Sequence, residues 1–538
     1  MFWTISQMNW IILPDKAILI PYFCEDTKLM KPGFLLVSLA FAFAFSACGR
    51  GDDGPRRLDY SVMLDTAGHY LLVNLDMEST PGTVVLNMPR WTPGYYEMMD
   101  FPKHLCDFSA QDAAGCAVAW EKEGMNRWKV TVPADGRLNV TYRIFADRRD
   151  VASSRVAGKV AFLSPAGVFM HVDGELQQPV SVHFDLPGGW EKISSGLLPV
   201  DGTTDTFRAD DFDRLYDSPF LLGNHYTSDF EHEGHAYHFA IETPDGLEES
   251  GFKEDFCKIV SAATRLMGDV PYDNYCLIHM GAGGGGLEHW NSQACFTDGT
   301  YRFADRGRYV SFLAFTAHEY YHLYNVKCIR PAELWPFDYD TEALTPMLWV
   351  SEGLTCYYEF RLLRTSGVAT PDEALAKLSG YFAGYAPYEG QRHMSLRQSS
   401  YDIWLNFMNR DRNGRDVKLD YYLKGPVAGL LMDIDIRRHT GQKKSLDDVM
   451  RGLYNRYYKQ LRRGFTEEEF WQEVEMAYGG PVPLLRAVVN TTEDIDYDSW
   501  LRDAGLYVDK ESWAIRRVEN PTPEQLAFLE TMEMIKPI

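Results

Sequence analysis

Short runs in which apolar and polar residues alternate fill the chain between residues 57 and 230. In the segment RLNVTYRIFAD, the side chains of Leu138, Val140 and Tyr142 fall on one face, which is the period of a half-buried strand. The segments TVVLNMP, RWKVTVP and VSVHFDLP repeat this pattern, with Pro and Gly between them. This part of the chain is therefore predicted to form an antiparallel β-sandwich of about seven or more strands.

The period changes to that of a helix near residue 253. The segment KEDFCKIVSAATRLMG has an amphipathic pattern that ends at Gly268, and the strand-like segment YCLIHMG follows it,. Further helical patterns cover residues 310–327, 347–364, 371–385, 420–439, 445–461 and 466–478. Strands grouped in one block and helices in the next predict an α+β multidomain chain.

Composition and charge narrow the classes of partner. The chain has 538 residues, enough for about two to four domains. Its formal net charge of −23 argues against a nucleic-acid partner, which requires clustered Lys and Arg.

The first 48 residues contain an export signal. An apolar run from Phe34 to Ala47 follows Met30, and it is too short to span a bilayer comfortably. Small residues then precede Cys48, as in a bacterial lipoprotein cleavage site, although Phe45 stands where Leu is usual. We expect Cys48 to become the lipid-bearing first residue; the alternative is a plain export signal in which this cysteine has no role.

We expect the protein to be an exported lipoprotein of a bacterial envelope, located in the periplasm or on the cell surface. Residues 1–29 are interpreted as an upstream extension and 30–48 as the signal peptide, so the membrane is contacted only through the lipid. Seven cysteines remain beyond Cys48, and their odd number and scattered spacing do not indicate a disulfide framework. Cys106 and Cys116 either form a pair or remain free thiols.

The segment TAHEYYHLYNVKCIRP carries the first candidate chemistry. His318 and His322 are one helical turn apart and share a face,, while Glu319 lies about 100° round the helix. This is the HExxH pattern, in which two imidazoles hold zinc and the glutamate acts as general base toward a zinc-bound water. A motif with only three fixed positions also occurs by chance in chains of this length. The HExxH pattern therefore indicates a zinc site only if a third ligand accompanies it.

A catalytic zinc has three protein ligands and one open position. Glu352 lies in the apolar helical segment MLWVSEGLTCYYE, and the 29 residues between His322 and Glu352 leave room for a loop and a returning helix. A buried carboxylate needs a partner, and a metal ion is a suitable one. Four other carboxylates in the connecting segment remain open as alternatives: Glu333, Asp338, Asp340 and Glu342.

The whole segment from His318 to Tyr358 resembles the active site of the glycyl aminopeptidases, family sixty-one of the metallopeptidases. After HExxH, the shared motifs are Asn325-Val326-Lys327, Ile329-Arg330-Pro331, Pro336 to Tyr339 and Trp349 to Gly353. The segment LNMPRWTPGYYEMMDF resembles the amino-terminal β domain of that family. The resemblance runs from about residue 58 to about residue 505. Tyr324 and Cys328 depart from it, where Trp and Arg are common.

The glycine run 283–286 is followed by Glu288 and His289. Glycine lets the backbone approach a ligand closely. The resemblance implies that Glu288 binds the free amino group of a peptide, and that Gly285, Gly286 and His289 line the substrate site. The alternative is a flexible turn with an exposed glutamate.

The segment DYYLKG at 420–425 resembles a Tyr-x-Lys-Gly motif of the same family. The resemblance implies that Tyr422 donates its hydroxyl to the oxygen that gains charge during hydrolysis. The neighbouring Tyr421 is expected to point elsewhere. The alternative is that Tyr422 is an ordinary core residue of a helix.

The resemblance also implies a domain order and an activity. We expect a β-sandwich at 55–230, a thermolysin-like zinc metallopeptidase domain at 231–365, a helical part at 366–510 and a tail at 511–538. Too few residues follow position 510 for the PDZ domain that many family members carry. The implied activity is removal of small amino-terminal residues, Gly or Ala, from peptides with a free amino terminus. The rivals are a thermolysin-like endopeptidase and a catalytically inert surface binding protein.

Overall fold

The structure is a computed structural model that describes residues 58–406 and 414–535. The predicted export signal and Cys48 lie outside the described residues. Within the described ranges, no helix combines the length and the apolar character needed to cross a membrane. The seven cysteines in these ranges are free thiols, so Cys106 and Cys116 do not pair.

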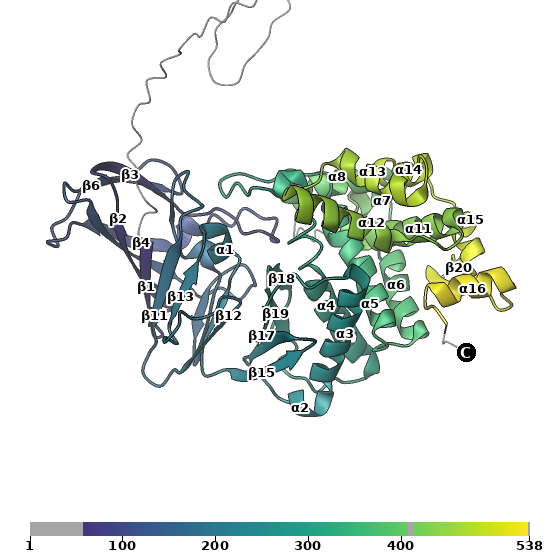
Figure 1. Cartoon of the computed structure of the whole chain (residues 1–538), viewed down its shortest axis with the longest axis horizontal. Helices are drawn as coiled ribbons and strands as arrows, with labels where there is room; N and C mark the ends of the chain where they lie inside the picture. The colour runs from purple at the N-terminus through teal and green to yellow at the C-terminus, as the bar shows by residue number, and fades with distance from the viewer. Residues whose placement is uncertain (1–57, 407–413, 536–538) are drawn as a thin grey trace, which may run out of the picture. The chain divides into compact units, whose positions relative to one another are not determined.

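The amino-terminal part of the described chain consists mainly of strands, as predicted, with one short α-helix, α1 (Phe212–Tyr216) (Figure 1). They form a six-stranded sheet in the order β13-β11-β1-β2-β7-β4 and two four-stranded sheets, β10-β3-β6-β5 and β12-β14-β9-β8. The pairs are antiparallel with one exception, since β1 and β11 run parallel. Alternation predicts which residues are buried, but it carries no information on strand direction. The strands are β1 (Leu58–Asp65), β2 (Tyr70–Glu78), β3 (Gly82–Asn87), β4 (Leu105–Gln111), β5 (Trp120–Lys122), β6 (Arg127–Val132), β7 (Arg137–Phe145), β8 (Arg155–Ala157), β9 (Val160–Leu163), β10 (His171–Val172), β11 (Val180–Asp185), β12 (Lys192–Ser195), β13 (Thr206–Ala209) and β14 (Phe220–Gly223).

A five-stranded mixed sheet separates the β domain from the helices. Its order is β15-β16-β17-β19-β18, so β18 is an edge strand. On β17, Tyr275 and Leu277 belong to the core of the helical part, whereas Cys276 and Ile278 belong to the core of the β domain. Both faces are therefore buried, which explains why YCLIHMG is almost continuously apolar. The strands are β15 (Tyr226–His232), β16 (His235–Ile241), β17 (Asn274–Ala282), β18 (Gly286–His289) and β19 (Ser292–Thr297).

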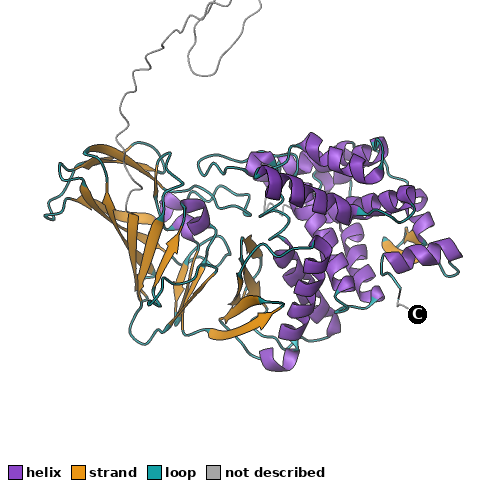
Figure 2. Ribbon diagram, viewed as in Figure 1, coloured by secondary structure: helices purple, strands orange, loops and turns teal. Residues whose placement is uncertain are grey.

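The rest of the described chain is mostly helical, as predicted (Figure 2). Two of the predicted helices contain a π-helical stretch, η4 (Trp349–Leu354) and η5 (Tyr454–Leu461). The main helices are α3 (Phe252–Met267), α4 (Arg306–Tyr321), α5 (Thr355–Thr365), α6 (Pro371–Tyr385), α8 (Leu396–Tyr401), α11 (Tyr421–Thr440), α12 (Leu446–Leu453), α13 (Glu467–Tyr478), α14 (Pro483–Asn490) and α16 (Pro523–Thr531). A short hairpin, β20 (Leu506–Asp509) and β21 (Ala514–Arg517), precedes α16.

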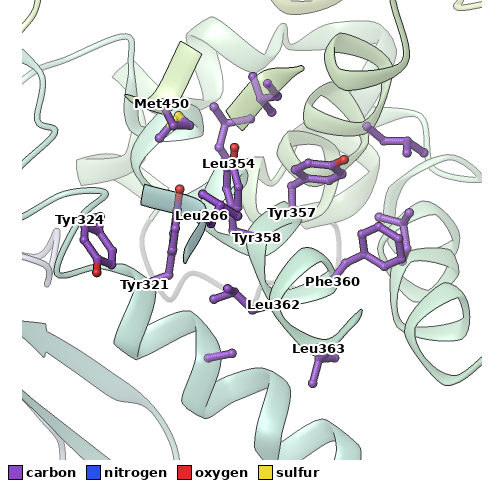
Figure 3. Close-up of a cluster of buried hydrophobic side chains, with 14 of the residues drawn as sticks. Leu266, Tyr321, Tyr324, Leu354, Tyr357, Tyr358, Phe360, Leu362, Leu363 and Met450 are labelled. Carbon is purple, nitrogen blue, oxygen red and sulfur yellow. The ribbon is translucent and has the colours of Figure 1, made fainter. Parts of the chain in front are cut away.

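Aromatic packing fixes α4 against α5. The rings of Tyr321 on α4 and Tyr358 on α5 are stacked with their centroids 4.4 Å apart. Leu354, Tyr357 and the surrounding apolar side chains complete this cluster (Figure 3). Because HExxH lies on α4 and Glu352 directly precedes α5, the cluster holds the two parts of the candidate metal site together.

Candidate metal and substrate site

Three side chains converge where α4 ends. The Nε2 atoms of His318 and His322 are 2.9 Å apart, and Glu352 Oε2 lies 3.6 Å from the first and 3.2 Å from the second. All three residues, which together form the metal group, are buried. Donor atoms bound to a tetrahedral zinc at 2.0–2.1 Å lie about 3.3 Å from one another. The separations and the two-histidine, one-carboxylate donor set therefore fit zinc.

The other ring nitrogen of each histidine is held in place. His318 Nδ1 lies 2.9 Å from Glu359 Oε1, and His322 Nδ1 lies 2.7 Å from the backbone oxygen of Asn325. When Nδ1 carries the proton in these contacts, Nε2 presents its lone pair to a metal. Burial opposes the charge of Glu359, but Lys377, His318 and Tyr381 outweigh it and lower its pKa to about 2.

Glu352 lies in the π-helical stretch η4, a local widening that often occurs at functional sites,. The side-chain amide of Asn325 donates to the backbone oxygens of Val350 and Ser351 at 2.7 and 3.2 Å. These bonds satisfy carbonyls in the disturbed turn. The same asparagine thus orients His322 through its backbone and supports the helix of Glu352 through its side chain.

Glu319 faces a cavity of about 730 Å³ that also reaches His318, His322 and Glu352. Gly286 on β18 lies against it, since a Cβ at this position would be 2.6 Å from Glu319 Cδ. Only glycine lets the edge strand pass this close to the carboxylate. Burial raises the pKa of Glu319 to about 7. The two histidines oppose this shift, and the carboxylates of Glu288 and Glu352 add to it.

Glu288 is another carboxylate that lines this cavity. It is 3% exposed, and its Oε1 has no hydrogen-bond partner in the described part of the chain. A loop of the β domain covers it, because a Cβ on Gly94 would lie 2.6 Å from Oε1 and 2.7 Å from Oε2. A buried carboxylate oxygen with no donor is costly by itself, so this position suits a cationic group supplied by a ligand.

Gly285 lines the same cavity, but His289 does not. Successive side chains of a strand point to opposite faces, and His289 Nδ1 lies 3.1 Å from Asp217 Oδ1. Asp217 also accepts from Lys327 Nζ and from the backbone N–H of Trp290, both at 2.8 Å. Burial opposes its charge, but Lys327 and His289 outweigh burial and lower the pKa of Asp217. A substrate contact by His289 stays a prediction.

Three tyrosines border the site. Tyr422 lines the cavity, with its ring centroid 6.5 Å from that of His318. Burial raises the pKa of Tyr422 well above its usual value, so its hydroxyl keeps a proton to donate. Tyr421 also lines the cavity, which differs from the expectation that it points elsewhere, because the cavity is wide enough to border two successive residues at the start of α11. Tyr96 of the β domain donates to Glu352 Oε1 at 3.4 Å.

The four alternative carboxylates do not converge with the histidines. Asp340 faces the β domain, where it accepts from Asn126 Nδ2 at 2.6 Å and pairs with Arg127 at 2.5 Å. In the same region, Trp91 Nε1 donates to the backbone oxygen of Asp338 at 2.8 Å. None of the four belongs to a group of side chains in the described ranges that could hold a metal ion: Glu333, Asp338, Asp340 and Glu342.

Sequence reasoning missed Glu359, Tyr96 and Asp217 as parts of the site. Glu359 had a usable signal, because it follows Glu352 by seven residues, about two helical turns, in the same segment,. Tyr96 lies in the quoted WTPGYY stretch, but nothing in its local pattern points to a partner at position 352. Asp217 carries no local signal at all.

Two family matches cover more than half of the chain. Residues 59–224 match the family described as Peptidase M61 N-terminal domain, and residues 311–428 match the family described as M61 glycyl aminopeptidase. No curated protein sequence matches the chain.

Solved structures share the fold. An aminopeptidase N family protein from Idiomarina loihiensis superposes with a TM-score of 0.79 at 26% identity, covering 84% of this chain and 79% of that one. A variant of the M1 zinc metallopeptidase from Deinococcus radiodurans, bound to a Tyr-Ser-Ala substrate, gives a TM-score of 0.51 at 14% identity and covers 82% of this chain and 94% of that one. The second likeness concerns the fold alone.

Proposed function

The chain belongs to the M61 glycyl aminopeptidase family, and from this premise we propose that it is a zinc-dependent aminopeptidase. His318, His322 and Glu352 hold the metal in this proposal. The substrates are peptides with a free amino terminus, and the leaving product is the shortened peptide.

The observation that carries the proposal is the position of Glu288. Its partly unpaired carboxylate lies in the same cavity as the donor atoms of the metal group and the carboxylate of Glu319. An exopeptidase must bind an ammonium group one residue away from the bond that it cleaves, and a buried carboxylate serves this purpose. An endopeptidase has no use for such a group beside its metal.

Bound zinc supplies a Lewis acid that polarises the peptide carbonyl and makes water acidic. Glu319, one residue from a metal-holding histidine, takes the proton of the attacking water and passes it to the leaving amine. Tyr422 keeps its hydroxyl proton and donates toward the developing oxyanion. The edge strand β18 offers backbone groups on its unpaired side, along which an extended peptide aligns.

A preference for small amino-terminal residues is part of the proposal. The loop at Gly94 lies directly on Glu288, and Val151 Cγ2 lies 3.8 Å from the position that a Cβ on Gly285 would take. The loop at Gly94 and the side chain of Val151, both from the β domain, narrow the space next to the amine-binding carboxylate. Gly and Ala side chains fit such a space better than long ones.

A panel of aminoacyl reporter substrates tests the proposal, each assayed free and N-acetylated, with and without a zinc chelator. We expect cleavage of free Gly and Ala substrates that the chelator abolishes and added zinc restores. Comparable cleavage of the acetylated substrates favours the thermolysin-like endopeptidase. Absence of both cleavage and bound metal favours the inert binding protein.

We further propose that the protein is exported and carries a lipid on Cys48. The support is the apolar run that ends in small residues before this cysteine,. Metabolic labelling with a radioactive fatty acid tests it. Label that is lost in Cys48→Ala supports the anchor, and an unlabelled, exported wild-type protein supports a plain signal.

A further inference from the structure

A second cavity, of about 470 Å³, lies between the loop after α3, the segment after the HExxH helix and η5. It shares no lining residue with the active-site cavity. Its walls are basic and aromatic, which is unusual in a chain with a net charge of −23. Its basic and aromatic lining residues include Arg330, Lys459, Arg462, Trp335, Tyr454 and Tyr458.

Arg330 is a buried cation that forms no direct ion pair in the described part of the chain. It is 7% exposed, its guanidinium donates to the backbone oxygen of Lys327 at 2.5 Å, and its Nε has no partner. In residues 58–406 and 414–535 no carboxylate forms an ion pair with it, and the charges of Asp217 and Asp213 act on it only from beyond ion-pair distance. Its guanidinium carbon lies 4.3 Å from the ring centroid of Trp335. Stacking offsets part of the cost of burial, but a buried guanidinium is stabilised fully only by an anion.

The other cations of the cavity differ in how far they are neutralised. Lys459 pairs with Asp269 at 2.5 Å, and Arg463 pairs with Glu469 at 2.6 Å. Arg462 is exposed and has no ion-pair partner in the described part of the chain. Two guanidinium groups, those of Arg330 and Arg462, are therefore left to attract an anion into the same cavity.

We propose that this cavity binds a small organic anion, a carboxylate or phosphate group on a flat apolar body. Guanidinium groups match both oxyanions with paired hydrogen bonds. Tyr454 and Tyr458 form the flat wall, with ring centroids 5.2 Å apart, and Trp335 is 44% exposed at the rim. The volume exceeds what a bare phosphate fills, so the body of the ligand contributes contacts of its own.

Calorimetric titration of the zinc-loaded protein at low salt tests the site with four probes: phenyl phosphate, benzoate, inorganic phosphate and phenol. We expect both aromatic anions to bind, inorganic phosphate to bind more weakly and phenol not to bind. The stronger of the two aromatic anions identifies the oxyanion that the site prefers. Higher salt should weaken binding, since the attraction is partly screened.

Variants separate this cavity from the active site, where an anion also meets a metal. Arg462→Ala, an exposed substitution, should weaken binding of the aromatic anions about tenfold, and Arg330→Gln should weaken it further. Arg137→Ala, an exposed arginine on β7, is the matched control and should leave binding unchanged. Equal affinity in the wild type and Arg462→Ala, or phenol binding as tightly as phenyl phosphate, would overturn the proposal. Because Arg462→Ala alone decides, a folding defect in Arg330→Gln does not affect the test.

Discussion

Gly353 and Gly425 cross at a distance that excludes any side chain. A Cβ on Gly425 would lie 2.5 Å from Gly353 Cα, and a Cβ on Gly353 would lie 2.7 Å from Gly425 Cα. The first glycine follows Glu352 directly, and the second lies three residues after Tyr422. This contact brings α11 against η4, so it sets the position of the tyrosine relative to the metal group.

Gly425→Ala should therefore displace α11 and misplace Tyr422. Overpacking of this kind costs about 1–3 kcal/mol of unfolding free energy, and kcat should fall while zinc content stays near one per chain. Gly380→Ala on α6 is the matched control, since a Cβ there meets nothing within 4 Å and alanine favours a helix. Thermal unfolding and steady-state kinetics of the two variants check the prediction. A Gly425→Ala protein with unchanged kcat would contradict this role of the crossing.

Glu319→Gln keeps the size of the side chain and removes its basicity. Zinc should remain bound, because Glu319 is not in the metal group, and turnover should fall by orders of magnitude. Metal analysis and kcat on a free Ala reporter measure the two effects. Turnover near that of the wild type would mean that another group accepts the proton.

Glu352→Ala should lose both metal and activity, because two imidazoles alone hold zinc weakly. The matched control is Glu342→Ala, an exposed carboxylate of the connecting segment, which should retain both. Zinc content after dialysis is the measurement. Full zinc in the Glu352→Ala protein would contradict the assignment of Glu352 as the third ligand.

The local parts of the site were predictable from the sequence. Two histidines at a helical spacing, and a carboxylate in an apolar helix, are features of one element each. The alternation that predicts strands and the longer period that predicts helices are local in the same sense. The structure confirms the resulting fold class.

Long-range contacts were not predictable in this way. Tyr96 reaches Glu352 across 256 positions of the chain, and no periodic pattern encodes that pairing. The parallel pairing of β1 with β11 depends on the path of the chain between them. Asp217, which contacts both the segment after α4 and the end of β18, belongs to a different domain from either.

Asp217→Asn should loosen the strand that carries Glu288. Lys327 would then lose its buried counter-charge, and removing one partner of such a pair costs about 3–5 kcal/mol. The pKa of Asp217 is lowered in the folded state, so its stabilising contribution is complete at neutral pH. That contribution shrinks only as the pH falls below about 3.9, the ordinary aspartate value.

Denaturant unfolding at pH 7 and at low pH, with the exposed Asp210→Asn as control, measures this effect. If Asp217 positions Glu288, KM for free peptides should rise more than kcat falls in the Asp217→Asn protein, with zinc content unchanged. A variant that is less stable but has an unaltered KM would show that Asp217 does not position Glu288.

The central claim, that Glu288 binds the substrate's amino group, is tested most directly by kcat/KM for one Ala peptide, free and N-acetylated, in the wild type and Glu288→Ala. An ion pair broken in a partly desolvated site costs about 2–5 kcal/mol, so kcat/KM for the free peptide should fall about 30-fold or more. Zinc content should not change, and the slow cleavage of the acetylated peptide, which has no ammonium group, should change little. Equal losses for the two peptides would show that Glu288 is structural and would contradict the aminopeptidase assignment.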